Sequence, residues 1–130
     1  MDTTQLKRIP LFSDAPDDQL KQVAAFAQTK EVSEGETIID EGGFSRELLA
    51  IEEGTAEVSR DGEKLTDLGP GDVFGEVGML DDDMRSATVK ATSRMKLISL
   101  GHFEVKRLKK DAPEVYEAIE KLVEERKSND

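Results

Sequence analysis

The sequence predicts an α+β domain in which an antiparallel β-roll lies between an N-terminal helix and two C-terminal helices. Residues 16–28 and 101–127 carry apolar side chains at the three- and four-residue spacing of amphipathic helices. Residues 30–100, in contrast, consist of short apolar runs separated by glycine-containing turns, as in small sandwiches and barrels. A chain of 130 residues suits one domain with one core.

The first helix is predicted at residues 16–28, PDDQLKQVAAFAQ. Pro16 is tolerated in a first helical turn, and the carboxylates of Asp17 and Asp18 complement the positive end of the helix dipole. The apolar residues that share one face of this helix are Leu20, Val23, Ala24 and Ala27.

Glycines punctuate the roll at intervals of about 7 to 12 residues, the spacing of short strands joined by turns. The Asp61-Gly62 pair, between TAEVSR and EKL, is the clearest hairpin signal, because a two-residue hairpin turn favours residues that tolerate positive φ angles. Two further strands are predicted in SATVKAT and RMKLISL, residues 86–92 and 94–100.

Two helices are predicted after the roll. The first covers HFEVKRLKK, residues 102–110, and the second covers DAPEVYEAIEKLVEERK, residues 111–127. Asp111 is expected to cap the second helix, and Pro113 to lie at its start. One face of the second helix forms a stripe of Val115, Ile119, Leu122 and Arg126. Tyr116 and Val123 flank this stripe.

The chain is strongly acidic, with 29 acidic and 18 basic residues and a formal net charge of -11. A nucleic-acid binder needs a basic face, so this balance argues against a nucleic-acid partner. The one basic cluster, residues 106–110, is interpreted as a solvated helix face with cations near the C-terminal end. A small anion is still an acceptable ligand, because one well-placed arginine outweighs distant surface charges that salt screens.

The chain contains no cysteine, and His102 is its single histidine. Disulfides and thiolate metal sites are therefore excluded, and a cupin-like metal enzyme would need several histidine ligands. We expect no enzyme activity, no cofactor and no metal. The N-terminal segment MDTTQLKRIPLF has no long apolar run, so neither a signal peptide nor a membrane span is expected. These features agree with a cytoplasmic location.

The stretch GDVFGEVGMLDDDMRSATVK, residues 71–90, places one arginine in an acidic neighbourhood. The residues from Gly75 to Leu80 are too few and too glycine-rich for an ordinary helix, but one helical turn there would direct free N–H groups at an anion. Arg85 follows after a loop, and an arginine fork beside such a turn is a good phosphate cradle. Glu76 would repel a phosphate, but it suits a hydrogen bond from a ribose 2′-hydroxyl. Together these groups indicate a ribonucleotide with few charges.

Two simpler interpretations of the same stretch stay open on chemistry alone. Glu76 and Arg85 could form a salt bridge that closes a loop. The run from Asp81 to Asp83 is interpreted as a solvated loop, because it lacks the alternation and the bidentate glutamate of a calcium-binding loop.

The segment FGEVGMLDDDMRSATV resembles the phosphate-binding cassette of the cyclic nucleotide-binding domain family, which includes the catabolite activator protein and the regulatory subunits of cyclic-AMP-dependent protein kinase. The family pattern is F-G-E, a small residue, a leucine, a short loop, then R-[STA]-A. The upstream segments IIDEGG, IEEGTAEVS and LGPGDVFGE are similar to the family's strands and glycine turns, so the resemblance runs from about Leu11 to Leu122. The residues that match the cassette are Phe74, Gly75, Glu76, Gly78, Leu80, Arg85, Ser86 and Ala87.

The resemblance implies a role for each matching residue. Arg85 would pair with an equatorial oxygen of a cyclic phosphate, and Glu76 would accept the ribose 2′-hydroxyl. The hydroxyl of Ser86 would add a bond to the phosphate or to a guanine edge. The backbone N–H groups expected around the phosphate belong to Gly75, Val77, Gly78, Ser86 and Ala87.

The resemblance also implies a fold of about eight strands, jelly-roll-like, with a short phosphate-binding helical turn. A single domain is expected over residues 1–130, with the roll at about 29–100 and the C-terminal helices at about 101–127. Met84 departs from the family, which commonly has proline there, and FSREL lacks the usual Gly-Asp-like turn. The base would be capped by Tyr116, Val123 or Arg126, by a second subunit, or not at all.

The implied function is that of a sensor which binds a cyclic nucleotide reversibly and relays it by movement of the C-terminal helices. Cyclic AMP is the expected ligand and cyclic GMP the second. The expected partners are a protein effector or a second copy through the C-terminal helix, with neither nucleic acid nor membrane. A cyclic-GMP-selective domain and a degenerate pocket that only mediates protein contacts are the alternatives, and whether the domain acts alone or within a larger chain stays open.

Overall fold

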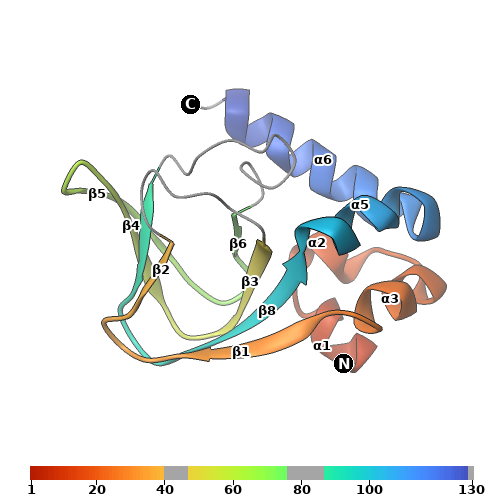
Figure 1. Cartoon of the computed structure of the whole chain (residues 1–130), viewed down its shortest axis with the longest axis horizontal. Coiled ribbons are helices and arrows are strands. Elements are labelled where there is room, and N and C mark those ends of the chain that lie inside the picture. Colours follow the sequence, from red (N-terminus) through yellow and green to blue (C-terminus); the bar gives the residue numbers. More distant parts are fainter. Residues whose placement is uncertain (40–46, 76–86, 129–130) are drawn as a thin grey trace.

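The computed structural model describes residues 1–39, 47–75 and 87–128, and the side chains of residues 123 and 126–128 lie outside this description. Within these residues, the helices gather on one side of a β-roll (Figure 1). The helices are α1 (Thr3–Lys7), α2 (Pro10–Ser13), α3 (Asp17–Ala24), α5 (His102–Asp111) and α6 (Pro113–Ser128). The strands are β1 (Gln28–Val32), β2 (Thr37–Ile39), β3 (Glu47–Glu53), β4 (Ala56–Arg60), β5 (Glu63–Leu68), β6 (Val73–Phe74), β7 (Thr88–Ala91) and β8 (Met95–Gly101).

The strands form two four-stranded sheets, and the predicted antiparallel roll with flanking helices is confirmed. The first sheet has the order β1-β8-β3-β6, and the second has the order β2-β7-β4-β5. Every pair of neighbouring strands in them is antiparallel. Strands that are distant in sequence are therefore neighbours in each sheet, as in a roll.

The first sheet separates two apolar clusters. Successive side chains of a strand point to opposite faces, and β3 shows this directly. Leu49 and Ile51 lie in the cluster inside the roll, whereas Leu48 and Ala50 pack against the helices. This one sheet therefore forms both a wall of the roll and the floor on which the helices rest.

The hairpin predicted at Asp61-Gly62 is confirmed. It joins β4 to β5, with Arg60 opposite Glu63. Asp61 has a φ of 53° and Gly62 a φ of 82°, and two successive positive φ angles are what a type I′ hairpin turn requires.

The N-terminal region differs from the single helix predicted at residues 16–28. Two more short helices, α1 and α2, precede it, and α3 ends at Ala24, so that Gln28 already begins β1. The two extra helices bury Leu6, Ile9 and Phe12 against the helix-side cluster. Helices this short are only marginally stable by themselves, and burial of these three side chains supplies the missing stability.

Local signals for α1 and α2 were present in the sequence. The Asp2 carboxylate accepts a hydrogen bond from the Thr4 N–H at 2.9 Å, and the Asp2 N–H donates to the side chain of Gln5 at 3.4 Å. This reciprocal pair is a capping box. Pro10 starts α2, where its missing N–H is not needed.

Both predicted C-terminal helices are present, and β8 leads directly into α5. Asp111, which was expected to cap the second helix, is instead the last residue of α5. The first N–H groups of α6 are accepted by the side-chain oxygen of Gln19 from α3. Val115 and Ile119 are buried on α6 as expected, and Leu122 is half-buried.

Candidate functional site

The described ends of the predicted phosphate-binding segment are Gly75 and Ala87. Gly75 follows β6 with a φ of +90°, a conformation that glycine adopts freely. Ala87 is half-buried and directly precedes β7. Because β6 lies at the edge of the first sheet and β7 lies within the second, the segment connects the two sheets. The predicted site residues that lie outside the described part of the chain are Glu76, Val77, Gly78, Arg85 and Ser86.

The strand that leads into this segment is held firmly. The backbone of Ile51 accepts a hydrogen bond from the Gly71 N–H at 2.8 Å and donates one to the Asp72 carbonyl at 2.8 Å. The Asp72 carboxylate accepts the Gly69 N–H at 2.7 Å and closes the preceding turn. The ring of Phe74 is buried inside the roll. These contacts fix the position at which the segment starts.

The strand that follows the segment is held on both sides. β7 pairs with β4, where Thr88 lies opposite Ser59, and with β2. Val89 is buried among the apolar residues inside the roll. Both flanks of the predicted phosphate-binding segment are therefore anchored in sheet structure.

Tyr116 is the one predicted base-capping residue whose side chain is described. It is half-buried on α6 and packs against the cluster between the helices and the first sheet. Burial, and then the negative charge of Glu120, raise the pKa of the Tyr116 phenol above its ordinary value. The side chains of Val123 and Arg126 lie outside the description. A capping role for any of the three stays a prediction.

Sequence reasoning missed a polar trio on the first sheet. The Lys30 ammonium lies 2.6 and 2.7 Å from the two carboxylate oxygens of Glu47, and the Ser99 hydroxyl donates to Glu47 at 3.1 Å. These contacts join β1 and β8 to the start of β3. The partners are 17 and 52 residues apart in sequence, so no local signal could have revealed them. Since Lys30 and Glu47 neutralise each other, the trio suits a structural role.

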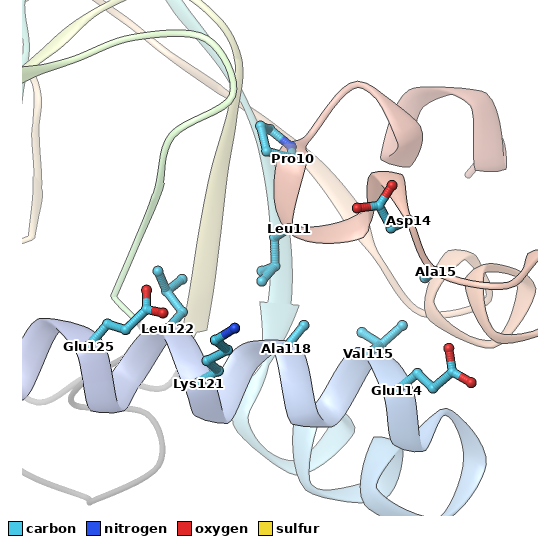
Figure 2. A pocket seen from close by; sticks show the side chains of 10 residues that line it. All are labelled: Pro10, Leu11, Asp14, Ala15, Glu114, Val115, Ala118, Lys121, Leu122 and Glu125. Carbon is cyan, nitrogen blue, oxygen red and sulfur yellow. The ribbon is translucent and has the colours of Figure 1, made fainter.

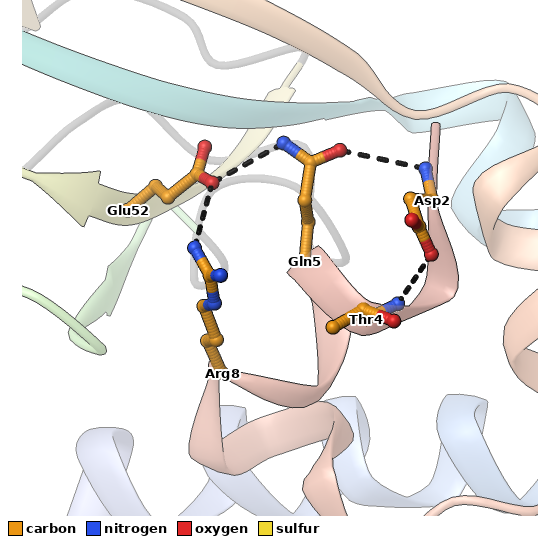
Figure 3. Close-up of polar contacts among 5 residues, drawn as sticks. All are labelled: Asp2, Thr4, Gln5, Arg8 and Glu52. Atoms are coloured by element: carbon orange, nitrogen blue, oxygen red, sulfur yellow. Dashed lines mark hydrogen bonds and ion pairs between the residues drawn. The ribbon is translucent and has the colours of Figure 1, made fainter.

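A second polar cluster attaches α1 to the end of β3 (Figure 3). The Gln5 amide donates to Oε1 of Glu52 at 3.2 Å, and a guanidinium nitrogen of Arg8 lies 3.8 Å from the same oxygen. The Glu52 side chain is only 4% exposed, and its Oε2 has no hydrogen-bond partner among the described residues. A nearly buried carboxylate thus depends on two N-terminal side chains.

The described residues contain no cluster of three or more histidine and carboxylate side chains placed to hold a metal ion. In the same part of the chain, no helix combines the length and the apolar character needed to cross a membrane.

An antiparallel roll of this topology, with a connecting segment of cassette sequence, defines a class of ligand-binding domain. The sequence model described as the cyclic nucleotide-binding domain matches residues 29–111. This range is more than half of the 130-residue chain and contains the whole predicted cassette. The chain therefore belongs to the cyclic nucleotide-binding domain family, as its sequence predicted.

Individual relatives agree with this assignment. A cAMP-dependent protein kinase regulatory subunit of Yarrowia lipolytica is 35% identical over 105 residues, which are 79% of this chain and 28% of that protein. A solved structure described as cAMP-bound PfPKA-R (141-441) has a TM-score of 0.83 at 25% identity, and the match covers 97% of this chain and 44% of that one. The catabolite activator protein of Thermus thermophilus has a TM-score of 0.83 at 26% identity, over 92% of this chain and 59% of its own.

The match covers only part of each relative. This chain spans between about a quarter and a third of the length of the curated relatives that it matches. The similarity therefore concerns a ligand-binding regulatory domain, and the ligand class that the family description names is a cyclic nucleotide.

Proposed function

We propose that this domain binds cyclic AMP reversibly and converts binding into a movement of its C-terminal helices. The observation that carries the proposal is the set Gly75, Glu76, Arg85, Ser86 and Ala87, which stands in family order within the matched residues 29–111. The related regulatory subunit of Yarrowia lipolytica is named as cAMP-dependent, and the PfPKA-R structure is described as cAMP-bound. These names favour cyclic AMP over cyclic GMP.

The proposed chemistry of binding uses charge and main-chain donors. A cyclic phosphodiester carries one negative charge, which a single arginine fork can match through paired, charge-assisted hydrogen bonds. Backbone N–H groups around Gly75, Val77 and Gly78, and of Ser86 and Ala87, would complete the cradle. Glu76 would accept the ribose 2′-hydroxyl and so select a ribonucleotide. No covalent step is needed, and the domain is proposed to perform no catalysis.

The described flanks of the segment support this proposal. Gly75 follows a strand fixed by β3, and Ala87 precedes a strand fixed by β4 and β2. A binding segment anchored at both ends loses less conformational entropy on closing around a ligand than one anchored at a single end.

The relay is proposed to act through Gly101, where β8 passes into α5. A side chain at Gly101 would meet the carboxylate of Glu104, the far end of a flexible side chain, so a larger residue at this junction requires Glu104 to shift. α5 and α6 share one apolar cluster with the first sheet. Ligand binding would shift the population between two packings of these helices against the roll. The proposed recipient of the signal is a protein effector, or a second copy through α6.

A titration with three nucleotides tests the proposal. A ligand at about 100 times its Kd stabilises a domain by about 2.7 kcal/mol, so millimolar cyclic AMP should raise the melting temperature clearly. Cyclic GMP should raise it less, and linear 5′-AMP, with its different phosphate charge and shape, should have little effect.

The alternatives give different results in the same titration. A larger shift with cyclic GMP than with cyclic AMP would identify a cyclic-GMP-selective domain. The absence of a shift with both cyclic nucleotides would overturn the proposal in favour of a degenerate pocket.

A further inference from the structure

A groove lies between α2 and α6, on the helical side of the molecule (Figure 2). Its volume is about 410 Å³. The apolar floor is formed by Leu11 from α2 and by three residues one to two turns apart on α6: Val115, Ala118 and Leu122. Leu11, Ala118 and Leu122 are only half-buried, so apolar surface remains open to a partner.

The rim of this groove is acidic. Asp14 and Glu114 lie toward one end, Glu125 lies at the other, and Lys121 lies between them (Figure 2). Three carboxylates thus face one ammonium group. Within the part of the chain that the structure describes, none of these four side chains forms an ion pair. The described rim residues therefore carry three negative charges and one positive charge.

The dimensions suit a short helix. Glu114 and Glu125 are eleven residues apart on α6, which corresponds to a length of about 16 Å at the helical rise. A second helix of about three turns, lying along this length, would place an apolar stripe on the floor and its flanking residues near the rim. A volume of about 410 Å³ accommodates a few large apolar side chains.

We infer that this groove is a docking site for a cationic amphipathic helix of a protein partner. Lysine or arginine residues beside the apolar stripe of such a helix would meet Asp14, Glu114 and Glu125. Opposite charges around an apolar centre give both specificity and fast association. No residue of the proposed nucleotide site lines this groove, so docking can be tested without nucleotide and separately from the proposed function.

Charge argues against the other occupants. A symmetric dimer would set the same acidic rim against itself, because a two-fold interface uses one patch on both copies. An anionic lipid surface would likewise be repelled. A second copy could still bind head to tail, since α5 presents an exposed face of Phe103, Lys106, Arg107 and Lys110. That occupant is therefore included in the test.

The test measures the binding of a synthetic peptide to the whole chain without nucleotide. The probe is a fluorescein-labelled fourteen-residue peptide of leucine and lysine only, with leucines at the spacing of one helix face, followed by fluorescence anisotropy at physiological salt. We expect saturable binding. The same peptide with glutamate in place of every lysine should not bind.

Matched variants locate the binding. Ala118→Trp fills the groove without changing charge and should weaken binding about tenfold or more, a typical effect of blocking a central contact. The double variant Glu114→Lys and Glu125→Lys should weaken it similarly. Glu34→Lys with Glu36→Lys makes the same change of charge in the exposed β1–β2 turn and should leave the affinity within about twofold. Circular dichroism establishes that each variant is folded.

Three results would overturn the inference. The first is an equal loss in the Glu34 and Glu36 variant, which would show attraction to the acidic surface in general. The second is unchanged binding by both Ala118→Trp and the Glu114 and Glu125 variant. The third is that the chain associates with itself and that either variant, Ala118→Trp or Phe103→Ser, abolishes this association. That result would identify a second copy as the occupant.

Discussion

The side-chain oxygen of Gln19 accepts hydrogen bonds from the backbone N–H groups of Glu114, at 2.9 Å, and of Val115, at 3.3 Å. One glutamine on α3 therefore satisfies donors in the first turn of α6, 95 residues further along the chain. Free N–H groups at a helix start need such acceptors. This contact fixes one end of α6 to the N-terminal helices.

Replacing Gln19 should destabilise the fold. In Gln19→Ala, two N–H groups lose their acceptor, and loss of a helix cap lowers the free energy of unfolding by about 0.5–2 kcal/mol. Urea denaturation measures the difference. Gln19→Glu, which keeps an acceptor and adds a charge that complements the helix dipole, should retain most of the stability. Equal losses in both variants would contradict a capping role.

The parts of the fold that the sequence predicted are those encoded by neighbouring residues. The β4–β5 hairpin follows from Asp61-Gly62, because the turn itself demands their backbone angles. The C-terminal helices follow from spacing and from Pro113. In contrast, the Gln19 cap and the pair formed by Lys30 and Glu47 join residues far apart in sequence. Such contacts depend on the final arrangement of elements, which local patterns do not determine.

The same distinction applies to the candidate site. The cassette from Phe74 to Ala87 is contiguous, so a resemblance to a family could identify its chemistry without coordinates. The structure adds that Gly75 directly follows, and Ala87 directly precedes, anchored strands that lie in different sheets. The residues predicted to cap the base lie on α6, near the other end of the chain. The hydrophobic spacing of a helix does not predict which of its residues would contact a ligand. For Tyr116, spacing correctly indicated only that it flanks the buried stripe of α6.

Glu52 should be sensitive to the loss of its partner Gln5. Its side chain is nearly buried, so Gln5→Ala leaves a carboxylate without its 3.2 Å hydrogen bond and should lower the free energy of unfolding by about 1–3 kcal/mol. Arg8 is 67% exposed and 3.8 Å away, so Arg8→Ala should lower it by less than about 1 kcal/mol. Chemical denaturation ranks the two variants.

A double-mutant cycle provides the control for this ranking. In a Glu52→Leu background no buried carboxylate remains, so Gln5→Ala should destabilise less than in the wild type and lose only its capping bond from the Asp2 N–H. If Gln5→Ala destabilised both backgrounds equally, its effect would come from helix α1 itself and not from Glu52.

Alkaline pH should weaken the packing of α6 through Tyr116. Burial and the charge of Glu120 raise the phenol's pKa in the folded state above 10.0, so the neutral phenol is favoured in the folded protein. This stabilisation is fully present below pH 10.0 and is lost as the pH rises through the raised pKa, because the unfolded state releases the proton first.

Absorbance of the phenolate measures this directly, since Tyr116 is the only tyrosine and tryptophan is absent. Glu120→Gln should bring the pKa of Tyr116 closer to its ordinary value. Above pH 10.0, the free energy of unfolding of Tyr116→Phe should fall less steeply with pH than that of the wild type. Titration of Tyr116 at or below pH 10.0 would show that the phenol is not held in this environment.

Arg85→Ala should remove most of the affinity for cyclic AMP. A phosphate that loses its charge-assisted partner in a closed site loses about 2–5 kcal/mol of binding free energy. Arg85→Lys keeps the charge but not the planar fork, so it should retain part of the affinity. Calorimetric titration compares the three proteins, and near-wild-type binding by Arg85→Ala would exclude this residue from the phosphate site.

Glu76→Ala should discriminate between cyclic AMP and its 2′-deoxy analogue. A hydrogen bond from the ribose hydroxyl to a carboxylate contributes about 1.5–3 kcal/mol, so the variant should bind cyclic AMP about tenfold or more weakly. The 2′-deoxy analogue makes no such bond, and its affinity for wild type and variant should be nearly the same. Each protein is compared with two ligands that differ in one hydroxyl. General damage to the cassette would therefore lower the affinity for both ligands equally. An equal loss would therefore place Glu76 in the scaffold of the cassette, away from the ribose.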